Sequence, residues 1–164
     1  MVVREIPLEK LDRYRARLLR FLRTYGDRRL TYKALRWLRD LPAKPADGTV
    51  MAVALDGKWL AGVIAIGNYG LAESIIAVKP VYRNKGIGKW LTRYVIDKHG
   101  RMYARVALDN IPSLKLCFSL DMVAFDLFTG VTGKPTFWLG AGDWDKEEVA
   151  RYTESKRTSD FTRN

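Results

Sequence analysis

One continuous stretch, residues 73–99, most constrains how this chain can fold. It begins with an apolar, β-rich run from Glu73 to Val78, continues through a loop with two closely spaced glycines, and ends in a helical pattern that reaches His99. Gly100 follows the last periodic residue, as is typical of a helix C-terminus. The sequence therefore predicts a strand, a glycine loop and a helix in direct succession.

The elements on either side place this unit in a mixed α/β domain. A short strand at 2–6 precedes two helices, one opened by Pro7 and one capped by Thr31. The apolar run 49–66 turns at Asp56-Gly57, a strong hairpin signal. Further patterns predict strands at 73–78, 102–108, 122–128 and 136–139 and helices at 87–99 and 110–120. This order predicts an α/β (α+β) fold with one central, mostly antiparallel sheet flanked by about four helices.

Composition adds limits to this fold. The chain has 164 residues, 48% of them hydrophobic, which is enough for one domain with a real core. We expect that domain to span 1–142 and the polar residues 143–164 to form a poorly packed tail. No apolar run approaches the roughly 20 residues of a membrane span, and the N-terminus does not resemble a secretory signal. One cysteine and one histidine fit a reducing compartment and argue against a zinc site. We expect a cytoplasmic monomer or homodimer without a metal.

The loop from Arg83 to Gly88 is the candidate binding site. Its glycines let backbone N–H groups approach a ligand closely, and the helix that follows adds unpaired N–H donors. Arg83, Lys85 and Lys89 add positive charge, so the loop is suited to a phosphate or pyrophosphate. The glycine spacing fits neither a Walker loop nor the three-glycine dinucleotide motif.

A longer pattern around this loop resembles a known one. Val78-Lys79-Pro80-Val81-Tyr82-Arg83-Asn84-Lys85-Gly86-Ile87-Gly88 resembles the pyrophosphate loop of the GCN5-related N-acetyltransferase (GNAT) family. The stretch 110–122 is similar to the family's later helix, which begins at an asparagine. The resemblance covers about residues 49–128. It implies that the chain binds an acyl-CoA, most simply acetyl-CoA, and transfers the acyl group to an amine by direct attack.

The resemblance also implies which residues contact the cofactor. Strand backbone would pair with the pantetheine arm, the loop amides would hold the pyrophosphate, and an asparagine would lie beside the cofactor. The implied set is Ile76, Ala77, Val78, Arg83, Asn84, Lys85, Gly86, Ile87, Gly88, Lys89 and Asn110. In this family the first two helices usually shape the acceptor site.

Two residues are candidates for the proton transfers. Glu73 lies where some family members place a carboxylate base, although a strand-end glutamate can also simply face water. Cys117 replaces the tyrosine that usually protonates the sulfur in this family. A thiol can donate a proton, but a lone cysteine on an apolar helix face is also typical of a small core residue. Other candidate donors are Tyr69, Tyr82 and Tyr103.

The segment 130–138 is the least family-like part of the chain. It combines two glycines, a lysine and two aromatic residues, which can line an acceptor pocket or form a plain hairpin. The sequence leaves both interpretations open.

Positive charge is concentrated near the N-terminus. The net charge is +11, and residues 1–45 hold 13 Lys and Arg against 5 Asp and Glu. Arg13, Arg17 and Arg20 fall on one helical face, and Arg36 lies on the next helix. Such a patch attracts polyanions, but it is also typical of a solvated face in a basic protein. A second hypothesis is therefore a GNAT-fold enzyme that modifies a DNA base or tRNA, and a third is a CoA binder without activity.

Overall fold

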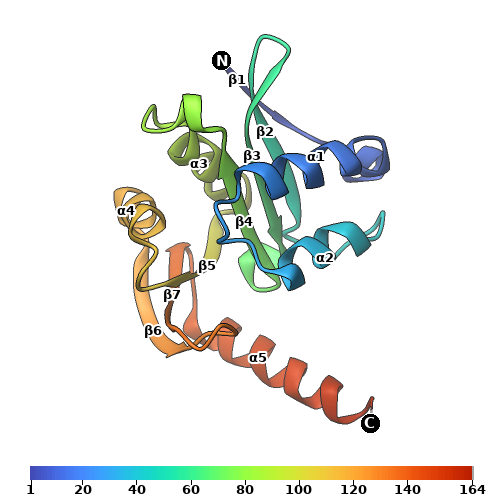
Figure 1. The fold of residues 1–164 in the computed structure, drawn as a ribbon. Coiled ribbons are helices and arrows are strands. Elements are labelled where there is room, and N and C mark those ends of the chain that lie inside the picture. The colour runs from blue at the N-terminus through green and yellow to red at the C-terminus, as the bar shows by residue number, and fades with distance from the viewer. Residues whose placement is uncertain (164) are drawn as a thin grey trace.

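The computed structural model describes residues 1–163, and its strands form two antiparallel sheets (Figure 1). The first sheet has the order β1-β2-β3-β4 and the second the order β5-β7-β6. The strands are Val2–Glu5 (β1), Val50–Asp56 (β2), Trp59–Gly67 (β3), Glu73–Val78 (β4), Arg101–Ala107 (β5), Val123–Thr129 (β6) and Pro135–Gly142 (β7). The α/β class and the antiparallel pairing are confirmed. The expected central sheet, however, is divided into two hydrogen-bonded parts between β4 and β5.

Five α-helices and three short 3-10 helices complete the fold of residues 1–163. The α-helices are Leu11–Tyr25 (α1), Tyr32–Asp40 (α2), Ile87–His99 (α3), Ile111–Ser119 (α4) and Lys146–Phe161 (α5). The 3-10 helices are Leu8–Lys10 (η1), Asn68–Gly70 (η2) and Pro80–Tyr82 (η3). No α-helix within residues 1–163 is both long and apolar enough to cross a membrane.

The first sheet has helices on both faces because its strands alternate between two cores (Figure 1). Met51 and Val53 on β2 pack with α1 and α2. Val50 and Ala52 on the same strand pack with α3, α4 and the second sheet. The strand β4 follows the same rule, so its backbone lies between the N-terminal helices and the α3 side of the molecule.

The predicted helix ends are confirmed by the local geometry. The Thr31 hydroxyl accepts a hydrogen bond from the Ala34 amide at 3.1 Å at the start of α2. Gly100 closes α3 with a φ of 74°, a left-handed conformation that favours glycine. Asn110 accepts from the Ser113 amide at 3.4 Å at the start of α4.

The segment expected to be a polar tail forms α5, which projects away from the body (Figure 1). Asp145 caps it by accepting from the Glu147 amide at 2.9 Å, and acidic residues in its first turn suit the helix dipole. Val149 is its one buried residue. The sequence gives little indication of this helix because the helix lacks an apolar stripe, although Asp145 is recognisable as an N-cap residue.

Candidate active site

The strands β4 and β5 lie side by side only where β4 begins. There the Arg105 guanidinium donates a hydrogen bond to the Ala72 carbonyl at 2.8 Å. Beyond this point β4 pairs only with β3, and β5 only with β7. The facing edge of β4, along residues 76–78, therefore carries backbone polar groups without a strand partner. The Val78 carbonyl accepts a hydrogen bond from Arg83, and the other groups of this edge need a partner from a ligand or water.

The loop at the far end of β4 presents free amides. Asn84 and Gly86 are both left-handed, with φ of 59° and 80°, and α3 has no side chain capping its start. The first backbone bond of the helix runs from the Trp90 amide to the Gly86 carbonyl at 2.9 Å. The amides of residues 86–89 donate to no acceptor within residues 1–163. Four consecutive donors at a helix N-terminus form a seat for an anion.

Gly86 has a positive φ that favours glycine, whereas the backbone conformation of Gly88 suits any residue. A Cβ atom added at Gly88 would lie 3.6 Å from Leu116 and 3.7 Å from Ile76, which is ordinary van der Waals contact. The protein itself therefore leaves room for a side chain there. A glycine at this position is explained by a ligand that approaches the backbone closely.

The Arg83 side chain turns away from this seat. Its guanidinium donates to the Val78 carbonyl at 2.8 Å and to the Tyr25 carbonyl at 3.1 Å, and it pairs with Asp27 at 2.8 Å. The charge expected beside the phosphate is thus used to brace the loop against the end of α1. Lys85 and Lys89 form no ion pair within residues 1–163, so they remain free to face an anion.

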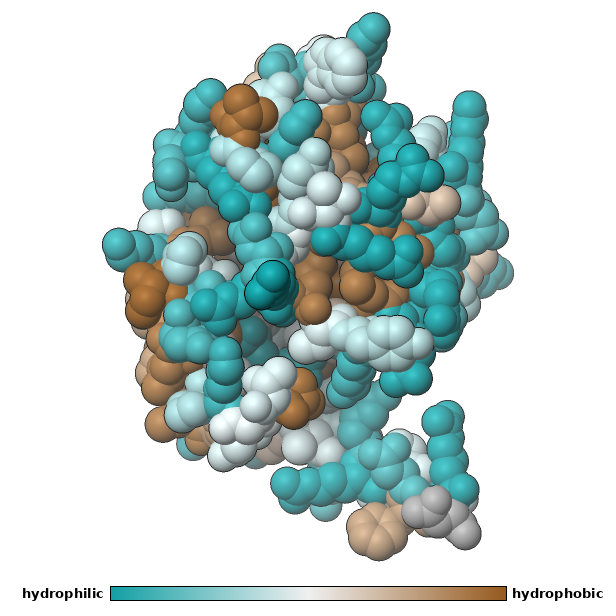
Figure 2. Space-filling model, viewed as in Figure 1, coloured by the Kyte–Doolittle hydropathy of each residue, from teal (hydrophilic) through white to brown (hydrophobic). Residues whose placement is uncertain are grey.

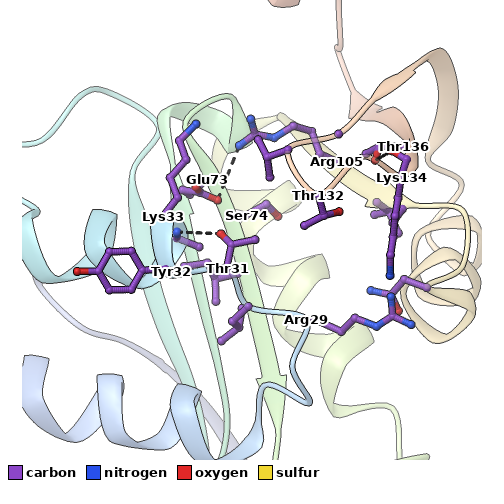
Figure 3. Close-up of a pocket in the computed structure, with 18 of the residues that line it drawn as sticks. Arg29, Thr31, Tyr32, Lys33, Glu73, Ser74, Arg105, Thr132, Lys134 and Thr136 are labelled. Atoms are coloured by element: carbon purple, nitrogen blue, oxygen red, sulfur yellow. Dashed lines mark hydrogen bonds and ion pairs between the residues drawn. The ribbon is translucent and has the colours of Figure 1, made fainter.

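A cavity of about 500 Å³ lies at the other end of β4 (Figure 3). Its walls come from the α1–α2 connection, the start of β4, the end of β5 and the β6–β7 connection. That last connection is a hairpin, since the Gly130 amide donates to the Lys134 carbonyl at 2.8 Å, and it also lines the cavity. The hairpin interpretation of segment 130–138 is therefore confirmed. Its tip also contributes to the cavity wall, although Phe137 and Trp138 do not line the cavity.

Glu73 lies in this cavity wall and does not face open water. Its side chain is 12% exposed, and the Arg105 guanidinium lies 3.7 Å from its carboxylate. Burial raises the pKa of the Glu73 carboxyl above its usual value, while Arg105 and Lys33 act in the opposite direction. A buried carboxylate with a raised pKa in a cavity is typical of a functional group.

Cys117 lies in the core and not in the cavity wall. Its side chain is buried with Leu114 and Leu120, and burial raises the pKa of the thiol to about 11. Asn110 does line the cavity, although its side-chain oxygen is used to cap α4.

The three candidate tyrosines lie elsewhere. The Tyr82 hydroxyl donates to Asp56 at 3.0 Å, and the buried Tyr103 hydroxyl donates to the Asp145 carbonyl at 3.2 Å. The Tyr69 ring packs against the Arg101 guanidinium, 3.7 Å from its centroid. Among tyrosines in the described part of the chain, the cavity wall holds Tyr32.

Several cavity residues were missed by sequence reasoning. They are Arg28, Arg29, Thr31, Tyr32, Lys33, Ser74 and Arg105. A signal was present for Arg105, a charged residue inside an otherwise apolar strand. Of the others, Arg28 and Arg29 lie in the α1–α2 connection, Thr31 to Lys33 lie at the start of α2, and Ser74 lies on β4. The sequence pattern does not show that these residues face a cavity.

The arginines proposed to contact nucleic acid are exposed. Arg13, Arg17 and Arg20 form no ion pair within residues 1–163, and neither does Arg36. By contrast, Arg15 on the same helix donates to the Leu38 carbonyl in α2 and to the Leu41 carbonyl just after it. Figure 2 shows hydrophilic side chains over much of the face that carries α1 and α2.

Comparisons with known proteins agree with this architecture. The family model described as "Acetyltransferase (GNAT) family" matches residues 12–118. An IAA acetyltransferase from Bacillus cereus superposes with a TM-score of 0.61 at 16% identity, over 86% of this chain and 98% of the other.

Two further solved structures are similar. A putative acetyltransferase from Salmonella typhimurium, solved with acetyl-CoA, has a TM-score of 0.56 at 16% identity, over 86% of this chain and 92% of that one. A spermidine N-acetyltransferase mutant from Vibrio cholerae has a TM-score of 0.57 at 14% identity, over 93% and 97%. At these identities the likeness shows the fold alone. No curated protein matches the sequence.

Proposed function

Because the chain belongs to the acetyltransferase (GNAT) family, we propose that it transfers the acetyl group of acetyl-CoA to an amine bound beside Glu73. One observation carries the proposal. The free amides of residues 86–89 and the buried carboxylate of Glu73 lie at opposite ends of β4, along the edge that β5 leaves unpaired. A cofactor held at one end of this strand can reach an acceptor at the other.

The residues present fit an acyl-CoA. Packing within the protein does not require a glycine at position 88, so the open space beside Gly88 is available to a ligand. The amides of residues 86–89 are free to hold a pyrophosphate. The backbone edge at 76–78, which has no strand partner, would pair with the pantetheine amides, while Lys85 and Lys89 add charge. We assign Arg83 to the acyl-CoA site because its backbone belongs to the loop and its side chain holds the loop in place. We assign Asn110 a position beside the cavity.

When bound, acetyl-CoA supplies a thioester carbonyl: the new C–N bond replaces the C–S bond, and the CoA sulfur takes a proton from water as it leaves, which balances the proton that the amine loses. Glu73 is placed to take the proton that the amine must lose, directly or through one water, because its carboxylate faces the cavity. Its raised pKa brings it closer to the range in which a general base works well. We assign Cys117 a packing role, since it is buried in the core and its thiol stays protonated at neutral pH.

The test is binding followed by turnover. Acetyl-CoA should raise the Tm of the protein, and the double variant Gly86→Glu/Gly88→Glu should abolish that rise. Thiol release from acetyl-CoA should then appear with at least one member of a panel of amines, peptides, DNA and tRNA. No Tm shift at saturating acetyl-CoA would refute the proposal. A Tm shift without thiol release on any acceptor would instead indicate a CoA binder without activity.

A nucleic-acid acceptor is the second candidate function, and the unpaired arginines of α1 favour it. In that case binding to duplex DNA or tRNA should weaken steeply with salt, because each neutralised phosphate releases counterions. The triple variant Arg13→Gln/Arg17→Gln/Arg20→Gln should reduce that salt slope. The matched control, Arg151→Gln/Lys156→Gln/Arg157→Gln on α5, removes the same charge from a distant helix. Equal effects of the two variants would show only general attraction.

A further inference from the structure

The acceptor cavity is strongly cationic. One carboxylate lines it, that of Glu73, against five basic side chains: Arg28, Arg29, Lys33, Arg105 and Lys134. Figure 3 shows Lys33 and Arg105 near Glu73, and Arg29 close to Lys134 on the opposite side. Charge inside a concave wall acts more strongly on a ligand than the same charge on an open surface.

Only part of this charge is neutralised by the protein. Arg105 pairs with Glu73 at 3.7 Å. Arg29 and Lys134 share a single carboxylate, Asp109, at 2.9 Å and 2.7 Å. Two carboxylates therefore serve three of the five cations. Arg28 and Lys33 form no ion pair within residues 1–163.

The start of α2 adds to the same potential. Residues 31–34 line the cavity, so the positive end of the helix dipole faces it. Thr31 satisfies the Ala34 amide with its hydroxyl and the Leu35 amide with its carbonyl. The amides of Tyr32 and Lys33 have no intrahelical partner, as at any helix N-terminus, and are left as donors.

We propose that the acceptor is a small amine that also carries a carboxylate or phosphate group, held by Lys33, Arg28 and the N-terminus of α2. This inference rests on the proposed acetyl transfer and names its substrate class. A cavity of about 500 Å³ suits a small molecule. The amine end is directed to Glu73, the single carboxylate of the wall, and the anionic end to the cations that have no partner. A polycation would meet an excess of positive charge instead.

Matched amine pairs test the charge preference directly. Thiol release from acetyl-CoA is measured with β-alanine against β-alaninamide, with phosphoethanolamine against ethanolamine, and with spermidine. The anionic member of each pair should have a KM at least about tenfold lower, as expected for a charge-assisted hydrogen bond. The two pairs separate a carboxylate from a phosphate as the recognised group.

Variants then locate the site. Lys33→Glu should erase the preference for the anionic member, with the KM for acetyl-CoA unchanged. The control Lys58→Glu makes the same charge change on the distant β2–β3 turn and should leave the preference intact. Equal or better turnover of amides, ethanolamine or spermidine would overturn the inference while leaving acetyl transfer standing. Transfer to DNA or tRNA alone would overturn it in favour of a polymeric acceptor. Absence of thiol release with every acceptor would overturn the proposed function itself.

Discussion

The two candidate binding sites at the ends of β4 present different kinds of group to a ligand. At the loop end, the donors are backbone amides of residues 86–89, which belong to one short stretch and depend on glycine conformation. At the cavity end, the groups are charged side chains drawn from four separate segments. Backbone donors survive most side-chain substitutions, whereas charged side chains can be exchanged one by one. The loop end is therefore suited to a constant cofactor, and the cavity end to an acceptor that changes readily during evolution.

Replacing the carboxylate at the cavity end should have the largest effect. We expect Glu73→Gln to lower turnover by a factor on the order of 10²–10⁴, the range for loss of a general base. The loop is untouched, so acetyl-CoA should still raise the Tm by the same amount. Steady-state kinetics and a thermal shift assay check the two parts. Turnover within a few fold of the wild type would remove Glu73 from the mechanism.

The same variant should also alter stability, with a defined pH dependence. Burial raises the pKa of Glu73 in the folded state above the value of about 4.3 that it has when unfolded. Between these two pKa values the folded protein holds more protons, so its stability falls as pH rises through that window. Gln does not titrate. The Tm of Glu73→Gln relative to the wild type should therefore increase from pH 4 towards neutral pH, and a constant difference would contradict the raised pKa.

A substitution at Gly88, at the loop end of β4, should have a smaller effect, and only on the binding of acetyl-CoA. Gly88→Ala should weaken acetyl-CoA about 10- to 100-fold, because the added methyl group displaces one or two charge-assisted hydrogen bonds. The Tm of the free protein should not fall, since the space for a Cβ exists and alanine favours the helix. Calorimetric titration and thermal unfolding measure these quantities.

Gly86→Ala is the contrasting variant. Its φ of 80° disfavours any side chain, so it should lower stability by about 1–2 kcal/mol as well as affinity. If Gly88→Ala lowered the Tm as much as Gly86→Ala, the glycine would have a structural reason and the binding argument would fail.

This contrast explains how much could be predicted from the sequence. The strand Glu73–Val78, the helix Ile87–His99 and its closing glycine are local patterns, and all three are where the sequence predicts them. The candidate phosphate seat lies within that stretch, so the sequence alone is enough to name its residues. The cavity is different, because Lys33, Glu73, Arg105 and Lys134 meet only after folding.

Two further features could not be predicted from sequence patterns. The division of the sheet between β4 and β5 depends on which strands pair, and both strands are apolar enough to belong to one continuous sheet. The direction of the Arg83 side chain is set by the Tyr25 carbonyl and Asp27, which lie more than fifty residues earlier in the chain. From the sequence alone, a charged residue in a binding motif is interpreted as a ligand contact. Only the structure shows whether its side chain is already paired within the protein.

Arg83 links the two regions, and its removal should affect both moderately. Arg83→Gln loses the contacts to Val78, Tyr25 and Asp27, which at this partly exposed position we expect to lower stability by about 2 kcal/mol. The Tm should fall by roughly 4–8 °C. The Kd for acetyl-CoA and the KM for the acceptor should both rise, because Arg83 braces the loop against the end of α1, and the α1–α2 connection that follows forms part of the cavity wall.

An unpaired arginine on α3 provides the control. Arg93→Gln removes the same charge from an exposed position and should change the Tm by less than about 1 °C, as is usual for such surface sites. A variant at Arg83 that weakened acetyl-CoA without lowering the Tm would show that the guanidinium contacts phosphate when the cofactor is bound.

The smallest effect is expected at Cys117, which lies outside both regions. Cys117→Ala leaves a small gap beside Leu114 and Leu120 and should cost about 1 kcal/mol, or a Tm lower by roughly 2–4 °C. Turnover should stay within twofold, and the folded wild type should resist a thiol reagent because burial raises the pKa of Cys117 to about 11. A hundredfold loss of turnover with the fold intact would instead make Cys117 the proton donor to the leaving thiolate. The acetyl-transfer step would then depend on a core residue as well as on the two ends of β4.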